Sequence, residues 1–265
     1  MGRKTKIDWC DSSWNPVTGC LHGCEYCYAR RIATRFGGLA PDSECHELDE
    51  LNRDTRGNAD VYPFGFAPTL HRYRLDEPQK WKKPRTIFVC SMADLFGDWV
   101  PDEWIDDVIR ATQKATQHRY LFLTKNPDRH DEWLERFEEG RVTGLDTIEN
   151  CWFGTSATNN EQLERANRTR AMWLSIEPIR EKIYTDEDQF MEFVQTPNGE
   201  YERRRWEWVV IGAETGNSKH KVIPKKAWID DIVHECEYYG TPVFMKESLR
   251  ELMGDDFKQE FPWEV

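Results

Sequence analysis

The sequence contains no long apolar run. None of its apolar stretches approaches the roughly 20 residues that a helix needs to span a bilayer. The basic residues 1–6 are not followed by the apolar segment of a secretory signal. Mean hydropathy is −0.80 and 32% of the residues are charged. We therefore expect no membrane-spanning segment, a cytoplasmic location, and eight cysteines that stay reduced.

An excess of positive charge is also missing. The sequence contains 36 Lys and Arg residues and 48 Asp and Glu residues, so its net charge is −12. This balance argues against a sequence-independent nucleic-acid binder, which is usually basic overall. The net charge does not exclude a local basic face, and basic residues are concentrated at 71–85. They are His71, Arg72, Arg74, Lys80, Lys82, Lys83 and Arg85, with Tyr73 and Trp81 between them. This stretch is either a solvated face or a surface that follows phosphates with stacking aromatic rings.

Three cysteines lie close together, and no fourth one lies near them. Cys20, Cys24 and Cys27 have the spacing C-x3-C-x2-C, whereas the other five cysteines are scattered along the chain. Structural zinc takes four protein ligands, and a cubane [4Fe–4S] cluster usually takes four thiolates. Three close thiols therefore suggest a cluster with one iron left open. The alternative is a zinc site completed by a distant cysteine or by His22.

This motif, with Tyr26 before its last cysteine, resembles the signature of the radical S-adenosylmethionine (AdoMet) superfamily. The resemblance implies a [4Fe–4S] cluster on Cys20, Cys24 and Cys27, with AdoMet chelated at the open iron and Tyr26 packed near its adenine. One electron from the cluster would cleave AdoMet to methionine and a 5′-deoxyadenosyl radical, which abstracts a hydrogen atom from the substrate. It also implies an electron donor such as flavodoxin or ferredoxin.

From residue 84 onward, short apolar runs alternate with amphipathic stretches. The apolar runs predict strands at 86–90, 120–124, 151–155, 172–176, 208–212 and 242–245, and the amphipathic stretches predict helices at 102–117, 128–138, 159–171 and 225–239. A helix is also expected at 25–36, after the cysteines. Apolar strands that alternate with helices indicate a parallel sheet buried on both faces.

We therefore expect an α/β fold, namely a partial or closed (β/α) barrel of six or seven parallel strands. The chain is expected to form a single domain over residues 1–265, because one core of this size is allowed at this length. An irregular insertion is expected at about 39–83, and a short C-terminal tail after the last strand.

Polar residues follow each predicted strand. In a (β/α) barrel the carboxyl ends of the strands form the active-site face, so this set predicts a site there. Any single member could instead be only a helix cap or a turn. With AdoMet as the implied cofactor, its binding residues are assigned as follows: Ser91 and Asp94 at the methionine end, Ser156, Glu177 or Glu214 at the ribose hydroxyls, and Lys125 or Lys246 at the carboxylate or a substrate phosphate.

Catalytic candidates come from the same region. Lys246 follows the last predicted strand, and Cys90 and Cys151 lie within earlier strands. Either thiol could return a hydrogen atom to a product radical, although a cysteine within a strand is more commonly part of the core.

The resemblance extends over the whole chain. Residues 14–20, 88–96, 122–125, 174–178 and 210–216 are similar to those of an uncharacterised, phage- and prophage-associated family of radical-AdoMet-like proteins. That family looks related to the branch that contains spore photoproduct lyase, which repairs thymine dimers in DNA. One departure concerns the Gly-Gly-Glu that usually follows the second strand and binds the AdoMet amino group. Residues 91–94, Ser-Met-Ala-Asp, stand in its place, so Asp94 would take the acidic role.

Three hypotheses for the function follow. The first is a radical AdoMet enzyme that acts on a nucleic acid or nucleotide, which the resemblance and the basic stretch favour. The second is a radical AdoMet enzyme that modifies a peptide or protein, which the acidic net charge favours. The third, from another class, is a non-catalytic module that binds zinc or a cluster.

Overall fold

The computed structural model describes residues 5–37, 44–185, 187–196, 199–216 and 221–264. The chain divides into two compact units, Met1–Trp152 and Phe153–Val265, which are described separately below. The expectation of a single domain over 1–265 stays a prediction. No helix in these described ranges combines the length and the apolar composition required to cross a membrane.

The main sheet contains seven strands in the order β1-β5-β6-β7-β8-β11-β12. The recorded pairs between its neighbouring strands are parallel. Within the described residues β1 and β12 stand at the two ends of this order, so the sheet is open and not a closed barrel. The predicted fold class is therefore confirmed as an α/β fold of seven parallel strands in its partial form.

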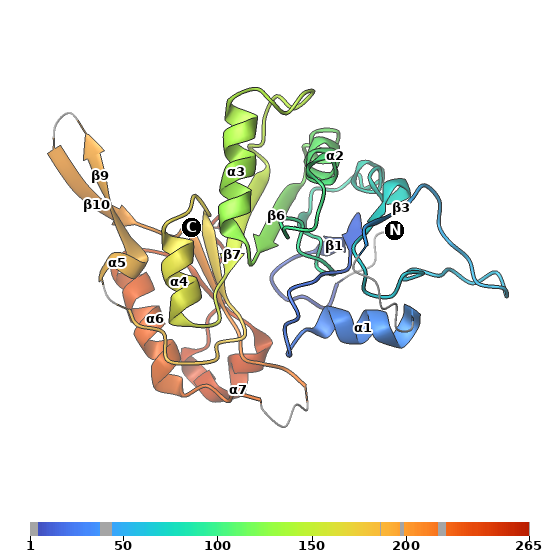
Figure 1. Cartoon of the computed structure of the whole chain (residues 1–265). Coiled ribbons are helices and arrows are strands. Elements are labelled where there is room, and N and C mark those ends of the chain that lie inside the picture. Colours follow the sequence, from blue (N-terminus) through green and yellow to red (C-terminus); the bar gives the residue numbers. More distant parts are fainter. Residues whose placement is uncertain (1–4, 38–43, 186, 197–198, 217–220, 265) are drawn as a thin grey trace. The chain divides into compact units, whose positions relative to one another are not determined.

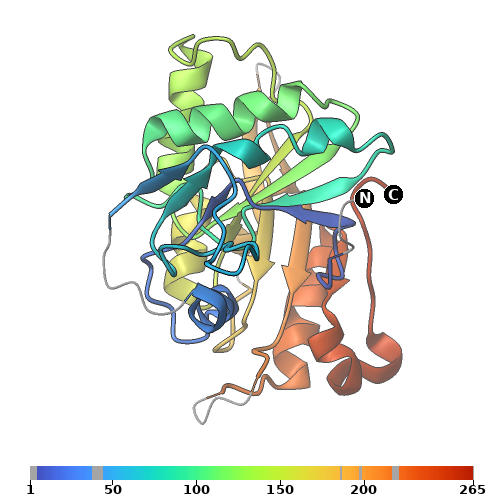
Figure 2. The ribbon, with the colours of Figure 1, turned by 90° about the vertical axis from the view of Figure 1, so that its right-hand side faces the viewer.

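Unit 1 holds the first three strands of the sheet and the predicted insertion (Figures 1 and 2). Its elements are β1 (Ser12–Trp14), β2 (Val17–Thr18), α1 (Tyr28–Gly37), β3 (His46–Leu48), β4 (Thr69–His71), the short 3-10 turns Arg72–Arg74 and Pro78–Lys80, β5 (Thr86–Val89), α2 (Asp102–Gln113), β6 (Arg119–Thr124) and α3 (Pro127–Glu138). The strand β7 (Cys151–Ser156) begins at its end.

The predicted insertion is more regular than its composition suggested. Residues 39–43 lie outside the described residues, but β3 and β4 form a second, three-stranded sheet with β2 in the order β2-β4-β3. Because β2 ends at Thr18, directly before Gly19, this small sheet supports the start of the cysteine loop. Strands of two or three residues carry too little periodic pattern to be predicted from sequence.

The helices of unit 1 follow the predicted pattern, with small shifts at their ends. Trp104, Ile105, Val108 and Ile109 form the buried stripe of α2, as expected. The helix α1 begins at Tyr28, three residues after the predicted start at residue 25, because residues 25 and 26 form a turn. Its buried side chains are small, and this leaves an exposed apolar face that is considered below.

Unit 2 contains β8 (Trp173–Ile176), β11 (Trp208–Ile211) and β12 (Val243–Met245), whose residues are buried throughout. Its helices are α4 (Asn160–Asn167), α5 (Glu187–Phe190), α6 (Lys226–Tyr238) and α7 (Arg250–Met253), with short 3-10 turns on either side of α7 at Glu247–Leu249 and Gly254–Asp256. The core packs aliphatic side chains of the strands, such as Leu174 and Val209, against Ile229 and Ile232 of α6. The predicted tail also packs here, since the ring of Phe261 lies 5.1 Å from that of Phe244.

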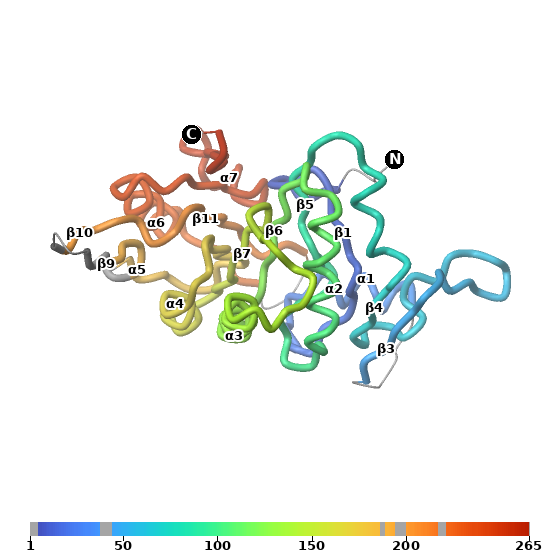
Figure 3. The backbone as a smooth tube through the Cα atoms, turned by 90° about the horizontal axis from the view of Figure 1, so that it is seen from above, coloured from blue at the N-terminus to red at the C-terminus, as the bar shows by residue number. Residues whose placement is uncertain are grey.

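A hairpin in unit 2 was not predicted. The strands β9 (Met191–Thr196) and β10 (Gly199–Arg204) pair antiparallel within a segment that reads as mixed and charged in the sequence. The hairpin follows α5 and extends outward from the rest of unit 2 in both Figure 1 and Figure 3.

Candidate active site

The cysteine loop begins at a glycine that no other residue could replace without strain. Gly19 has φ +88°, and a Cβ placed on it would lie 2.1 Å from the carbonyl oxygen of Ala67. The N–H of Gly19 donates to the carbonyl of Met92 at 2.9 Å, and the N–H of Cys20 donates to that of Phe66 at 3.3 Å. The first cysteine is thus fixed between the segment after β5 and the segment before β4.

The other two cysteines lie at the entry to α1. A turn closes between them, with the N–H of Cys27 donating to the carbonyl of Cys24 at 3.2 Å. The N–H of Arg30, in the first turn of the helix, donates to the sulfur of Cys27 at 3.3 Å. All three cysteines are half-buried and none forms a disulfide.

The thiol of Cys20 lies in a setting that disfavours its ionised form. Burial raises its pKa to about 12, and the negative charges of Asp94, Cys27 and Cys24 contribute to the rise. These charges belong to the same loop and to Asp94, which is hydrogen-bonded to His22 of that loop. A cationic iron centre would offset both effects, because a metal ion inverts the local pKa preference and a coordinating thiol is deprotonated. The donor set therefore fits an iron–sulfur cluster.

A histidine in the loop is bonded to a buried carboxylate. The Nε2 of His22 donates to Oδ2 of Asp94 at 2.7 Å, and only 5% of Asp94 is exposed. Burial opposes ionisation of Asp94, but the hydrogen bond and charge of His22 and the donors of β6 outweigh it and lower the pKa of the carboxyl. Those donors are the N–H of Lys125 at 2.8 Å and the hydroxyl of Thr124 at 2.7 Å.

With the N–H of Phe96 at 3.1 Å, Asp94 accepts four hydrogen bonds from the protein itself. Asp94 thus connects the cysteine loop to the carboxyl end of β6 through hydrogen bonds. Its predicted contact with the AdoMet amino group stays a prediction.

Three other predicted residues of unit 1 lie around the loop. The ammonium of Lys125 lies 5.7 Å from the ring centre of Tyr26, the residue expected near adenine. The hydroxyl of Ser91 donates to Oδ1 of Asn15 at 3.1 Å, and its carbonyl accepts from the hydroxyl of Tyr28 at 2.5 Å. Ser91 therefore connects the segment after β5 to the start of α1, which positions the loop from a second side.

The two candidate hydrogen donors are both buried. Cys90 is 3% exposed, has φ +55°, and its pKa is raised to about 12 by burial. Cys151 is 4% exposed, and its sulfur lies 3.4 Å from the hydroxyl of Thr112 in α2. Because Cys151 begins β7 and faces a helix, its placement does not support hydrogen donation at the carboxyl ends of the strands.

Unit 2 places its own set of predicted residues at the ends of its strands. Lys246, after β12, donates to Oε1 of Glu177, after β8, at 2.5 Å. Gly212, after β11, allows this approach, since a Cβ there would lie 3.0 Å from both side chains. Lys246 is thereby paired with a carboxylate.

The remaining predicted residues of unit 2 are buried. Glu214 is 5% exposed, and its Oε2 has no hydrogen-bond partner among the described residues. An ionised carboxylate oxygen only accepts hydrogen bonds, so this atom fits a donor such as a ribose hydroxyl. Ser156, at the end of β7, is 8% exposed.

The metal ligands themselves remain a proposal. In the described part of the chain, no three His, Cys, Asp or Glu side chains are gathered closely enough to form a metal site. The assignment of Cys20, Cys24 and Cys27 as ligands therefore rests on their spacing, their common loop and the electrostatics of Cys20.

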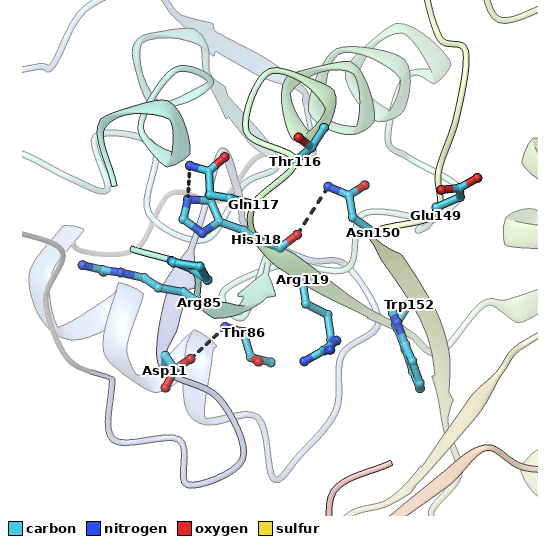
Figure 4. A pocket seen from close by; sticks show the side chains of 11 residues that line it. Asp11, Arg85, Thr86, Thr116, Gln117, His118, Arg119, Glu149, Asn150 and Trp152 are labelled. Carbon is cyan, nitrogen blue, oxygen red and sulfur yellow. Dashed lines mark hydrogen bonds between the residues drawn. The ribbon is translucent and has the colours of Figure 1, made fainter. Parts of the chain in front are cut away.

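A cavity of about 440 Å³ lies elsewhere in unit 1, at the amino ends of β5 and β6 (Figure 4). The guanidinium of Arg119 lies in it, 6.0 Å from the ring centre of Trp152. The sequence did not predict this cavity, and its lining contains none of the predicted site residues. It lies at the ends of β5 and β6 opposite to Asp94 and Lys125, so it is separate from the candidate active site.

Comparisons with known proteins give one family and one group of solved structures. A family model described as "Protein of unknown function (DUF5131)" matches residues 4–253. No curated protein matches the chain.

The solved structures are of spore photoproduct lyase. Its complex with dinucleoside spore photoproduct is 11% identical with a TM-score of 0.45, over 93% of this chain and 79% of that one. A mutant with bound AdoMet and dinucleoside spore photoproduct is 11% identical with a TM-score of 0.43, over 92% and 78%. The similarity is distant, so the functional argument below uses the residues of this chain.

Proposed function

Since the chain belongs to the family described as protein of unknown function DUF5131, its activity has to be argued from its own residues, and we propose that it is a radical AdoMet enzyme. The observation that carries the proposal is the cysteine loop. Three thiols with the spacing C-x3-C-x2-C lie in a segment that Gly19, Ser91 and Asp94 fix at the carboxyl ends of β5 and β6.

Cys20, Cys24 and Cys27 would hold a [4Fe–4S] cluster. When bound, the cluster supplies the electron that cleaves AdoMet reductively, and the product of this cleavage abstracts a hydrogen atom from the substrate. The N–H of Arg30, which donates to the sulfur of Cys27, would stabilise the thiolate form of that ligand. The His22–Asp94 pair would hold the loop against the central sheet and so limit how far the three cysteines can move when they bind the cluster.

In unit 1, AdoMet would be bound by groups around the loop. Tyr26 offers an aromatic face, and Lys125 lies close to it with a cation suited to the AdoMet carboxylate. In unit 2, Glu214 remains the predicted residue for a ribose hydroxyl, because its buried Oε2 is an acceptor with no hydrogen-bond partner among the described residues. Lys246 is already paired with Glu177, so we assign this pair to the substrate side, where a phosphate or carboxylate would compete for the lysine.

A nucleic acid or nucleotide is the proposed substrate class. Of the basic stretch, the side chains of Lys80, Lys82 and Lys83 are exposed and available to phosphates. The rest of the stretch has structural partners: Arg72, for example, pairs with Glu47 and Asp107, and His71 is fully buried. A nucleic-acid surface built on this stretch would therefore be smaller than the sequence suggested. With the net charge of −12, this keeps modification of a peptide as the second candidate.

The test is anaerobic reconstitution with iron and sulfide. The wild type should bind about four irons and cleave AdoMet when dithionite supplies electrons. Each of Cys20→Ala, Cys24→Ala and Cys27→Ala should lose both properties, whereas Cys45→Ala should keep them, because Cys45 is exposed and lies outside the loop. Stoichiometric zinc without iron uptake would instead identify a zinc-binding module.

A further inference from the structure

One face of helix α1 is exposed although it is largely apolar. Tyr28, Ile32 and Phe36 are 45%, 38% and 67% exposed. Arg31 and Arg35 are exposed as well and lie on the same face, because the five positions follow the spacing i, i+3, i+4, i+7, i+8. The helix is held to unit 1 by its other side, through the buried Ala29 and Ala33.

Such a face has the composition of a protein interface. Soluble proteins seldom expose apolar side chains in a contiguous group unless the group binds something. Aromatic residues and arginine are enriched at the centre of protein–protein interfaces. The helix carries three arginines and no acidic residue, whereas the whole chain has a net charge of −12. The face would therefore attract an acidic partner and repel a basic one.

The position of this face beside the cysteine loop indicates what the partner does. Tyr28 follows Cys27 directly, and Arg30 of the same helix donates through its backbone to the sulfur of Cys27 and through its side chain to the carbonyl of Cys20 at 3.4 Å. A protein that covers the exposed face would lie against α1 (Figure 1), in whose first turn the N–H of Arg30 donates to the sulfur of Cys27.

We propose that this face of α1 is the docking surface for an acidic one-electron carrier protein, an inference that rests on the proposed radical AdoMet function. One electron would pass from the reduced carrier to the cluster held beside Cys27. The carrier would thereby be oxidised and the cluster reduced. Tyr28, Ile32 and Phe36 form the apolar centre of the contact, and Arg31 and Arg35 form its charged edge.

The composition of the face favours a protein over a nucleic acid. Interfaces with nucleic acids are more polar and much more positively charged than those between proteins. Here an aliphatic side chain, Ile32, stands between two aromatic ones, and the arginines lie to one side. An aliphatic centre offers nothing to a phosphate backbone, whereas it can pack against the apolar surface around a protein's cofactor.

The first experiment measures binding, and it does not require the cluster. Oxidised flavodoxin and, separately, oxidised ferredoxin are titrated against the full chain at low and high salt. Phe36→Ser should raise Kd at least about tenfold, as expected for the loss of an aromatic anchor. Arg31→Glu with Arg35→Glu should weaken binding and flatten its salt dependence, because charges at the edge steer association.

A matched control uses the same change of charge elsewhere in unit 1. Lys82→Glu with Lys83→Glu alters two exposed cations that lie outside α1 and should leave carrier binding within about twofold of the wild type. Thermal melts of all variants establish that each one folds, which is expected since the substituted side chains are exposed.

The second experiment separates docking from catalysis. AdoMet cleavage by reconstituted protein is driven either by dithionite, which needs no docking surface, or by reduced flavodoxin. The α1 variants should cleave AdoMet at the wild-type rate with dithionite. With reduced flavodoxin, their rate should be at least about tenfold lower than that of the wild type.

The outcomes distinguish the two proposals. No cleavage with dithionite in the wild type refutes the proposed function. Dithionite-driven cleavage, combined with carrier binding that is absent or unchanged by the α1 substitutions, refutes the docking inference alone. If the same substitutions abolish binding of a DNA oligonucleotide but not of either carrier, the face is a nucleic-acid surface and the inference is wrong.

Discussion

The imidazole of His22 donates a hydrogen bond of 2.7 Å to the buried carboxylate of Asp94, and the two residues are 72 positions apart in the sequence. His22 lies between the first two cysteines, whereas Asp94 is bonded to the end of β6 through Thr124 and Lys125. One side chain therefore connects the cysteine loop to the central sheet.

Replacing Asp94 by Asn should loosen this connection. In the wild type, each carboxylate oxygen of Asp94 accepts two hydrogen bonds. In the variant, an NH2 group replaces one of these oxygens, and it would face two donors in either orientation of the amide. Leaving buried donors unpaired costs about 1–3 kcal/mol each, so the free energy of unfolding should fall by at least about 2 kcal/mol. Iron uptake on reconstitution should fall as well. Urea unfolding and iron analysis measure these effects, with the exposed Glu103→Gln as control. An Asp94→Asn protein as stable as the control would contradict the anchoring role.

Two glycines of the loop form a matched pair. Gly19→Ala places a Cβ 2.1 Å from the Ala67 carbonyl oxygen, whereas at Gly23, with φ +73°, a Cβ meets nothing within 4 Å. Gly23→Ala should cost only the strain of the left-handed backbone, about 1–2 kcal/mol. Gly19→Ala should lower the free energy of unfolding by clearly more than Gly23→Ala does, and it should also reduce iron uptake. Denaturation midpoints and iron content of both variants test this. Equal losses in the two variants would show that the close approach at Gly19 is unimportant.

Glu214 should contribute to AdoMet binding. The Glu214→Gln substitution keeps the shape of the side chain but replaces its carboxyl group, whose buried Oε2 has no hydrogen-bond partner among the described residues, with an amide. A hydrogen bond to a charged group contributes about 1.5–3 kcal/mol, so AdoMet affinity should fall at least about tenfold. The cluster spectrum should be unchanged. Equilibrium binding of AdoMet measures the effect against the exposed control Glu251→Gln. If Glu214→Gln and Glu251→Gln bind AdoMet with equal affinity, the ribose is bound by residues other than Glu214.

Stability should decrease in mild acid because of His71. Burial and the nearby charge of Arg74 lower its pKa from 6.5 to about 3, and its Nε2 lies 2.9 Å from the hydroxyl of Thr18 in β2. Between these pKa values the unfolded chain binds a proton that the folded chain does not. The free energy of unfolding should therefore fall as pH drops from 6.5 towards 3, by up to about 1.4 kcal/mol per pH unit from this group.

The variant His71→Gln should lose this part of the pH dependence. Urea unfolding at pH 7, 6 and 5 measures it, with the exposed His234→Gln as control. A slope against pH that is the same in His71→Gln and the wild type would show that His71 does not titrate on unfolding.

The substrate class is tested by the exposed lysines. If the substrate is a nucleic acid, Lys80→Glu, Lys82→Glu and Lys83→Glu together should weaken oligonucleotide binding. They should also reduce the slope of log K against log salt by about 0.9 for each duplex phosphate that the protein no longer neutralises. AdoMet cleavage without substrate should be unaffected, and Lys225→Glu in unit 2 is the control. A wild type that binds no DNA or RNA oligonucleotide at low salt would favour the peptide-modifying alternative.

The sequence predicted the elements whose signal is local. The strands at β5, β6, β8 and β11 are runs of apolar residues, and α2 repeats its buried residues at helical spacing, so their type could be determined within one window. The α/β fold class follows from their alternation. The cysteine motif is local too, since three thiols within eight residues share one loop in any fold.

Only the tertiary structure decided what surrounds that loop. The bond between His22 and Asp94, the close approach of Gly19 to Ala67 and the small sheet of β2, β4 and β3 join residues far apart in the chain, and no sequence period records them. The same holds for α1, whose apolar residues are spaced as a buried stripe would be, yet Phe36 is 67% exposed. Periodicity shows which side chains share a face, but only packing determines whether that face meets the core, solvent or a partner.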